Sequence, residues 1–282
     1  MQAGIAYLRK ELKDHYPAEE IEGLIRFIFR VWKRYDTREL LLRKQEVLNP
    51  ADRSLLHSVV HRLKRHEPIQ YILGETEFFG LPFRLSPDVL IPRPETEELV
   101  DWVIRSGPAP GSSVLDVGTG SGCIAVSLKQ KLPAMHVFGC DISEKALQIA
   151  RQNAEINRLP VTFFLMDILH PAPDSGPFDL IVSNPPYVTR KEIQQMQQNV
   201  TDYEPHAALF VPDDDPLRFY RALLSFGQSH LHPGGRQFWE INEAFGMKCM
   251  ELMTKSGYRE VELKKDINGK DRMISGRYPG SY

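Results

Sequence analysis

The sequence predicts an α/β protein in which a small all-α bundle and a β-hairpin linker precede a mixed, mostly parallel sheet. Three observations lead to this fold class. Apolar residues recur at helical spacing as far as about residue 64, and short apolar strands then alternate with helical segments. The last two strands lie too close together in the chain to hold a helix between them, so we expect them to pair antiparallel.

The first 72 residues have the pattern of a helical bundle. Apolar residues repeat every three or four positions with charged residues between them, as in Ile21, Leu24, Ile25, Ile28, Phe29 and Trp32. Helices are expected to start at Asp36 and at Asn49, because each offers a side-chain acceptor to the first turn and Pro50 follows the second. We therefore expect a bundle over residues 1–72.

Residues 73–92 are expected to form a β-hairpin linker. The β-prone segments TEFF and FRLS flank Gly80-Leu81-Pro82 in a stretch rich in glycine and proline. The third predicted domain then runs over residues 93–282.

Seven strands are expected in this third domain. They are SVLDVG, HVFGCD, VTFFLMD, FDLIVSN, GRQFWEI, REVELKK and DRMISGRY. Helical segments are expected between most of these strands, namely CIAVSLKQKL, EKALQIARQNAEIN, one around Pro216 to Phe226 and one from Glu243 to Ser256.

Composition narrows the class of function. The 282 residues are 42% hydrophobic and 26% charged, which is the balance of a folded globular protein. The formal net charge is -2, which disfavours a strongly basic nucleic-acid binder. Neither the three cysteines nor the nine histidines show metal-ligand spacing, so we expect no metal. The sequence has no apolar run of membrane-spanning length and no signal-peptide core at its start, so we expect a cytoplasmic protein without membrane contact.

A glycine-rich turn follows the first predicted strand of the sheet. The turn is Gly118-Thr119-Gly120-Ser121-Gly122, and its GxGxG spacing differs from the GxGxxG of dinucleotide folds. A phosphate-free nucleoside therefore fits better than a nicotinamide dinucleotide. Asp116, inside the preceding apolar strand, needs a cationic or N–H partner if it is buried.

Two further acids are the last residues of the next two predicted strands. Asp141 and Asp167 could accept hydrogen bonds from a ribose and from an adenine amino group, and together they would repel a phosphate. Either could instead cap a helix, as the sequence Asp141-Ile142-Ser143 suggests.

The sequence Asn184-Pro185-Pro186-Tyr187 follows the apolar strand Phe178 to Val182. A planar amide or exocyclic amine is a poor nucleophile, because its lone pair is delocalised. The Asn184 side-chain oxygen and the Pro185 backbone oxygen can accept both N–H protons and orient the nitrogen. The prolines stiffen this geometry, and the Tyr187 ring offers a face for stacking.

This NPPY motif resembles that of class I methyltransferases that act on planar nitrogens. With EPIQYILG, EFFGLPFRLSPDVLIPRPETE, DVGTGSG, TDYEPHAALF and KKDINGKDRMISGRY, the chain from about His66 resembles the peptide chain release factor glutamine N5-methyltransferases. The resemblance implies a Rossmann-like class I methyltransferase fold and the methyl donor S-adenosyl-L-methionine, with S-adenosyl-L-homocysteine as product. It also implies that the substrate is the glutamine in the Gly-Gly-Gln loop of peptide chain release factors. In such enzymes the N-terminal bundle helps to bind the release factor.

The resemblance also assigns residues. Gly118 to Gly122, Asp141 and Ile168 would line the donor site, and Asn184 to Tyr187 would hold the glutamine. Many family members have an aromatic residue at the position of Ile168, and an acid followed by a small residue where this chain has FWEIN.

Two other functions compete with this one. NPPY also serves adenine or cytosine amino methyltransferases acting on DNA or RNA, although the charge disfavours a nucleic-acid substrate. A catalytically silent binding protein is the other alternative. Within Arg93-Pro94-Glu95-Thr96-Glu97, Thr96 and Glu97 are expected either to cap the following helix or to form a lid over the donor site.

Overall fold

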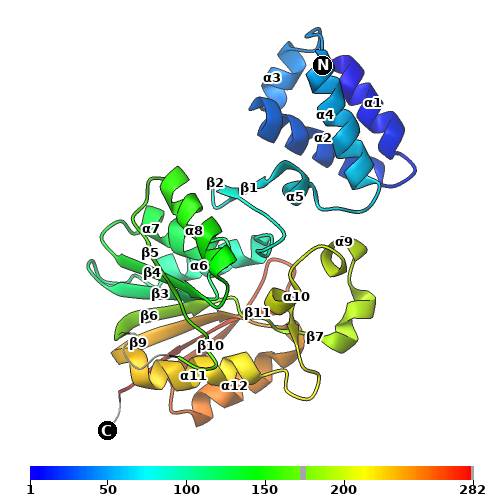
Figure 1. Ribbon diagram of the computed structural model, residues 1–282. Helices are drawn as coiled ribbons and strands as arrows, with labels where there is room; N and C mark the ends of the chain where they lie inside the picture. The colour runs from blue at the N-terminus through cyan, green and yellow to red at the C-terminus, as the bar shows by residue number, and fades with distance from the viewer. Residues whose placement is uncertain (172–175, 281–282) are drawn as a thin grey trace. The chain divides into compact units, whose positions relative to one another are not determined.

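The computed structural model describes residues 1–171 and 176–280, and the chain divides into two compact units (Figure 1). The bundle unit comprises Met1–Thr76 and Gln197–Tyr203, and the sheet unit comprises Glu77–Met196 and the chain from Glu204 onward. The sequence pattern placed residues 197–203 in the third domain, whereas the structure groups them with the bundle.

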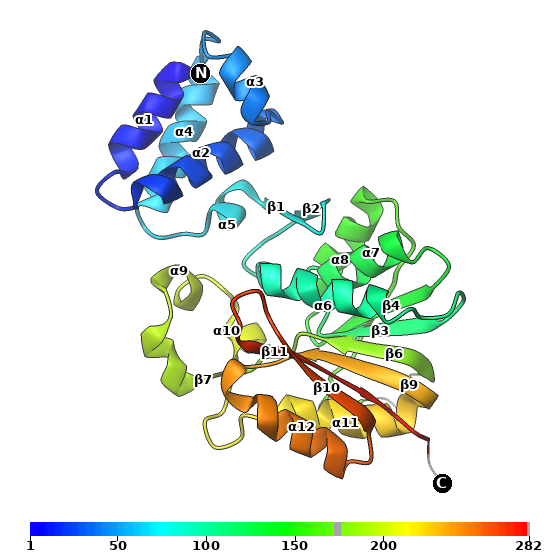
Figure 2. The same ribbon diagram turned by 180° about the vertical axis from the view of Figure 1, so that it is seen from behind.

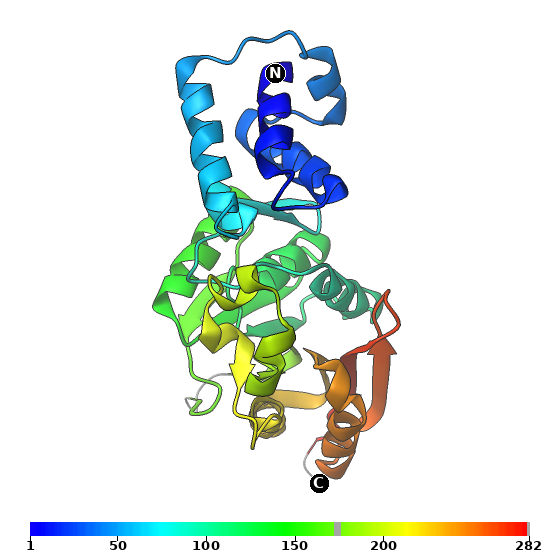
Figure 3. The ribbon, with the colours of Figure 1, turned by 90° about the vertical axis from the view of Figure 1, so that its right-hand side faces the viewer.

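The bundle unit is helical, as expected. Its helices are α1 (Gln2–Leu12), α2 (Ala18–Lys33), α3 (Thr37–Leu42), α4 (Pro50–Leu63) and α5 (Ile69–Leu73), which are coloured blue to cyan in Figure 3, and α9 (Gln198–Thr201). The predicted starts at Asp36 and Asn49 are confirmed, because each side chain accepts a hydrogen bond from the third residue of its helix. Leu8, Ile28, Phe29 and Leu56 are buried in the core of the bundle.

A hairpin of β1 (Glu75–Phe78) and β2 (Leu81–Arg84) follows the bundle helices. The turn consists of Phe79 and Gly80, which both have positive φ, at 52° and 77°. The predicted hairpin is thus confirmed.

The main sheet has seven strands in the order β10-β11-β9-β6-β3-β4-β5. The strands are β3 (Ser113–Val117), β4 (His136–Asp141), β5 (Thr162–Leu165), β6 (Phe178–Ser183), β9 (Leu231–Glu240), β10 (Arg259–Lys265) and β11 (Asp271–Arg277). The strand β11 is antiparallel to both of its neighbours, and the pairs from β9 to β5 are parallel. The predicted seven-stranded mixed sheet with an antiparallel last strand is confirmed.

Helices cover both faces of this sheet (Figures 1 and 2). One face packs against α6 (Pro94–Arg105), α7 (Cys123–Lys131) and α8 (Glu144–Ile156), and the other against α11 (Arg218–His230) and α12 (Gly246–Lys255). Strand residues alternate between the two cores, so that Leu180 and Val182 face the first group of helices and Ile181 faces the second. Among the described residues, no helix has the length and apolar character needed to span a membrane.

Short elements complete the sheet unit. They are the two-stranded sheet of β7 (Val188–Thr189) and β8 (Phe210–Val211), the 3-10 helices η1 (Arg190–Gln195) and η2 (Glu243–Phe245), and α10 (His206–Leu209). The helix predicted over Glu243–Ser256 is therefore η2 followed by α12.

One predicted strand end needs correction. The sequence VTFFLMD predicted that Asp167 ends the third strand, but β5 ends at Leu165. The Asp167 carboxylate accepts a hydrogen bond from the Leu169 N–H, which turns the chain away from the sheet edge.

Candidate active site

Three parallel strands carry the predicted site residues to one edge of the sheet. Val117, the last residue of β3, pairs with Cys140 of β4 on one side and with Ser183 of β6 on the other. The chain leaves β3 toward β4 and β5 and later returns to the opposite side of β3 as β6, which makes this edge a topological switch point. Gly118 and Asn184 thus directly follow the ends of two adjacent strands, β3 and β6.

A cavity of about 450 Å³ lies at this edge. Its wall includes eight of the residues singled out in the sequence, namely Gly118, Gly120, Asp141, Asp167, Ile168, Asn184, Pro185 and Pro186. The predicted residues outside its wall are Asp116, Thr119, Ser121, Gly122 and Tyr187. The cavity size is that of a pocket for a small organic ligand.

The glycine turn presents its backbone to the cavity. Gly118 and Gly120 have φ of 72° and 53°, and a Cβ added to either would meet no atom within 4 Å. These positions therefore face open space in a backbone conformation that other residues rarely adopt. The Gly118 and Thr119 N–H groups both donate to the Cys140 carbonyl at 2.9 Å, which fixes the turn on β4.

Asp116 lies beneath the turn and is completely buried. Its Oδ2 accepts hydrogen bonds from the Thr119 hydroxyl at 2.6 Å and from the Ala125 N–H at 3.2 Å. Within the described ranges, its Oδ1 has no hydrogen-bond partner. Burial, the largest influence, raises the pKa of Asp116 to about 7. The protein thus gives this carboxylate neutral partners only, and a cation nearby would favour its charged form.

Asp141 holds the glycine turn from the next strand. Its Oδ2 accepts from the Gly120 N–H and its Oδ1 from the Ser143 N–H, both at 2.9 Å. The N-cap of α8 is Ser143, whose hydroxyl accepts from the Ala146 N–H. The helix-cap alternative for Asp141 is therefore wrong. Burial raises the pKa of Asp141, and its backbone hydrogen bonds oppose that rise.

Asp167 also lies in the cavity wall but has different partners. Besides the Leu169 N–H, its carboxylate binds His170 Nδ1 at 2.9 Å. None of the described residues between Asp167 and β6 belongs to a helix, so Asp167 caps no helix there. Ile168 lies beside it in the wall, together with Ile142, Leu169 and Phe219.

The Asn184 side chain is connected to two buried residues. Its Nδ2 donates to Thr96 Oγ1 at 3.1 Å, and the Thr96 hydroxyl donates to Glu240 Oε2 at 2.6 Å. The Tyr187 hydroxyl donates to the other oxygen of Glu240 at 2.8 Å. Burial and the charge of Glu240 raise the pKa of Tyr187 well above its ordinary value, so this hydroxyl keeps its proton.

The segment Arg93–Glu97 contains the start of helix α6, but Thr96 and Glu97 do not cap that helix, and none of the five residues lines the cavity. Helix α6 begins at Pro94, and no side chain caps it. Thr96 is buried in the network described above, and Glu97 accepts from the Phe79 N–H at 2.6 Å. Arg93 donates to the buried Glu204 at 2.5 Å.

Several wall residues were not assigned from the sequence. They are Pro87 to Leu90, which precede α6, Pro205, Ala207 and Ala208 near α10, and Phe219 and Leu223 of α11. The first two groups lie in segments quoted for the family resemblance, whereas nothing in the sequence marked Phe219. Glu204, which precedes Pro205, connects the two segments, because its carboxylate accepts hydrogen bonds from the Ile91 N–H and from Arg93, just after Leu90.

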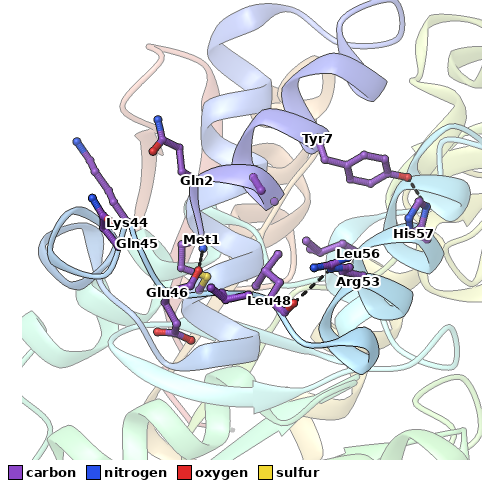
Figure 4. A pocket seen from close by; sticks show the side chains of 13 residues that line it. Met1, Gln2, Tyr7, Lys44, Gln45, Glu46, Leu48, Arg53, Leu56 and His57 are labelled. Atoms are coloured by element: carbon purple, nitrogen blue, oxygen red, sulfur yellow. Dashed lines mark hydrogen bonds between the residues drawn. The ribbon is translucent and has the colours of Figure 1, made fainter.

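Two larger hollows lie in the bundle unit, but neither contains a predicted site residue. One of about 650 Å³ is drawn in Figure 4, where Tyr7 points toward His57, with 2.7 Å between the hydroxyl and Nδ1. The other, of about 600 Å³, is lined by residues of α2, the chain around α5 and Gln197 to Asn199. Among the described residues, no group of three or more His, Cys, Asp or Glu side chains could hold a metal ion.

Comparisons with known proteins identify both parts of the chain. The family profile of the PrmC N-terminal domain matches residues 5–74, and that of the methyltransferase small domain matches residues 100–203. A solved structure of a methyltransferase from Pyrococcus furiosus covers 78% of this chain and 98% of its own, with a TM-score of 0.53. At 22% sequence identity this likeness supports the class I methyltransferase fold alone.

Two curated relatives are similar over nearly the full length. A release factor glutamine methyltransferase of Bacteroides thetaiotaomicron is 46% identical over 96% of this chain and 97% of its own. One of Flavobacterium psychrophilum is 43% identical over 93% of this chain and 94% of its own. Since these matches extend over the helical bundle as well as the sheet, the chain belongs to the family of release factor glutamine methyltransferases.

Proposed function

We propose that the protein transfers a methyl group from S-adenosyl-L-methionine to the side-chain amide nitrogen of a glutamine in peptide chain release factors. The observation that carries this proposal is the position of Asn184, whose tethered amide lies in the same cavity wall as the glycine turn. The names of the curated relatives support the choice of glutamine and release factors. The reaction would support translation termination in the cytoplasm.

The residues at the β3 and β4 ends fit the methyl donor. Gly118 and Gly120 leave room for close approach, Asp141 offers carboxylate oxygens to ribose hydroxyls, and Ile142 and Ile168 offer apolar surface to adenine. Bound there, S-adenosyl-L-methionine supplies an electrophilic methyl group on a sulfonium, and S-adenosyl-L-homocysteine is the product. Within the described residues Asp116 Oδ1 has no partner, and a sulfonium bound nearby would lower the raised pKa of Asp116 and favour its charged form.

The residues after β6 fit the glutamine. The Asn184 Oδ1 and the Pro185 carbonyl oxygen are acceptors that would hold the two N–H protons of the substrate amide. Holding both protons orients the nitrogen toward the methyl group and stabilises the positive charge that develops on it. No base is needed before transfer, because the proton is lost readily once the nitrogen is alkylated. Pro186 lines the cavity beside them, and the Tyr187 ring is proposed to stack on the amide plane.

The choice of one glutamine needs more than this cavity. Any exposed glutamine could present the same amide, so contacts away from the reacting atom must select the protein substrate. We assign the selected glutamine to the Gly-Gly-Gln loop and part of the selection to the bundle unit. A short Gly-Gly-Gln peptide should therefore be a poor substrate.

A labelling experiment tests the proposed function. The protein is incubated with donor labelled in its methyl group in five separate reactions. Each contains one candidate substrate: intact release factor, release factor lacking the loop glutamine, a Gly-Gly-Gln peptide, DNA or RNA. We expect strong labelling of the intact factor, weak labelling of the peptide and none of the other three. Label in DNA or RNA would instead identify an adenine or cytosine amino methyltransferase, and equal labelling of peptide and intact factor would remove the recognition role of the bundle.

A further inference from the structure

Four side chains from three distant parts of the chain form one hydrogen-bonded series at the residues proposed to hold the glutamine, Asn184 to Tyr187, which we call the acceptor end of the site. Thr96 lies in the first turn of α6, Glu240 is the last residue of β9, and Asn184 and Tyr187 follow β6. Thr96 and Glu240 are 2% and 1% exposed, so water contributes little to either. The distances are 3.1 Å from Asn184 to Thr96, 2.6 Å from Thr96 to Glu240 and 2.8 Å from Tyr187 to Glu240.

The direction of these bonds follows from counting protons. Thr96 donates its single hydroxyl proton to Glu240 Oε2. The Thr96 oxygen can then only accept from Asn184, and only the NH₂ end of the Asn184 amide can donate. The Asn184 amide is therefore held with Nδ2 on Thr96, which leaves Oδ1 as the end available to a ligand.

The pKa of Glu240 depends on its burial and on the charged and polar groups around it. Burial raises the pKa of Glu240, while the bonds from Thr96 and Tyr187 and the positive charge of Arg272 oppose this rise and the charge of Glu95 adds to it. Arg272 itself binds Asp266, with 3.1 Å between Nε and Oδ2, and lies 3.6 Å from Glu243. The positive charge of Arg272 thus offsets part of the rise in pKa that burial causes at Glu240.

We propose that Thr96 and Glu240 are positioning residues that fix the flip of the Asn184 side-chain amide, so that its oxygen and not its NH₂ group faces the substrate nitrogen. This inference rests on the proposed function, because it concerns the same acceptor site. A flipped Asn184 would present two protons to the two protons of the substrate amide and could not hold it. Glu240 also fixes the Tyr187 hydroxyl, so one buried carboxylate orients both side chains of the acceptor end.

Thr96→Val tests this proposal, because valine keeps the shape of threonine and removes only the hydroxyl. We expect kcat on intact release factor to fall about 10-fold to 100-fold, less than the roughly 100-fold to 1,000-fold typical of losing a direct transition-state hydrogen bond. The donor dissociation constant should stay within about twofold, because Thr96 does not line the cavity. Thr96→Ser, which restores the hydroxyl, should recover most of the lost rate.

A double-mutant cycle and a matched control separate positioning from general damage. In the Asn184→Ala background, Thr96→Val should cause no further loss of kcat, because the amide that Thr96 holds is gone. Ser127→Ala removes another buried hydroxyl, that of an α7 residue with no hydrogen-bond partner in the described part of the chain, and should leave kcat unchanged. An equal loss in both backgrounds, no recovery with Thr96→Ser, or unchanged kcat in Thr96→Val would each overturn the proposal.

A spectroscopic readout keeps this inference distinct from the proposed function. The side-chain NH₂ signal of Asn184 in an NMR spectrum of labelled protein is identified by its absence in Asn184→Ala. It should move in Thr96→Val and keep its wild-type position in Thr96→Ser and Ser127→Ala. An unmoved signal in Thr96→Val contradicts the positioning role even if release factors are not the substrate, whereas a moved signal with no label on release factor contradicts only the proposed function.

Discussion

The proposed donor end of the candidate site (the glycine turn with Asp116, Asp141 and Asp167) and the proposed acceptor end (Asn184 to Tyr187) are built in different ways. The donor end consists mainly of backbone, since Gly118 and Gly120 expose the main chain and Asp141 binds it through two N–H groups. The acceptor end depends on side chains, since Asn184 and Tyr187 are held through Thr96 and Glu240. The first end is suited to binding by shape, and the second is suited to orienting one nitrogen.

Because of this difference, we expect substitutions at the two ends to affect donor affinity and turnover separately. Substitutions at the donor end should alter stability or donor binding and spare turnover at saturating donor. Substitutions at the acceptor end should lower turnover and spare donor binding.

The largest expected effect is at the donor end and concerns pH. Burial raises the pKa of Asp116 from 3.8 to about 7 in the folded protein. The unfolded chain therefore loses this proton near pH 4 while the folded protein keeps it, and stability falls as pH rises from about 4 to 7. Three units correspond to roughly 4 kcal/mol.

Asp116→Asn should remove this part of the pH dependence. The difference in unfolding free energy between variant and wild type should then shift in favour of the variant by up to roughly 4 kcal/mol between pH 4 and pH 8. Urea unfolding at several pH values measures it. A difference that is constant with pH would show that the pKa of Asp116 is not raised.

The next largest effect is expected at the acceptor end. Asn184→Ala removes an acceptor that acts on the reacting nitrogen, so kcat should fall by about 3 to 4 kcal/mol, or roughly 100-fold to 1,000-fold. Donor affinity, measured by calorimetry, should not change. Asn268→Ala, in an exposed turn, is the control. A loss of less than tenfold, or a loss of donor affinity, would contradict the role assigned to Asn184.

The smallest effects are expected from removing the carboxylates of Asp141 and Asp167 at the donor end. Asp141→Ala should weaken donor binding by about 1.5 to 3 kcal/mol, roughly 10-fold to 100-fold, with little change in kcat at saturating donor. Asp167→Ala should weaken it less than about tenfold, because that carboxylate is engaged with His170 and does not hold the glycine turn. Equal effects at the two positions would remove the distinction drawn between them.

The same contrast explains what could be predicted from sequence. The glycine turn and Asn184 directly follow apolar strands and Asp141 ends one, so local pattern and the rules of parallel sheets bring them together. The partnership of Thr96 with Glu240 spans 144 residues, and no local pattern indicates it. Threonine in the first turn of a helix usually signals a cap, and for this reason its burial against β9 was not foreseen.

Two other features escaped prediction for related reasons. Gln197–Tyr203 groups with the bundle although the sheet unit flanks it on both sides in the chain, and neither charge nor composition marks it off. Phe219 belongs to a helix with an ordinary amphipathic pattern, so its place in the cavity wall depends on how α11 packs on the sheet.

The central claim is that the reacting atom is the amide nitrogen of the release-factor glutamine. Mass spectrometry of peptides from intact release factor, after incubation with donor and this protein, locates the methyl group directly. We predict one added methyl group, carried by the peptide with the Gly-Gly-Gln sequence and fragmenting on the glutamine side chain. A methyl group on any other residue, or an unmodified glutamine after prolonged incubation with active enzyme, would contradict the claim.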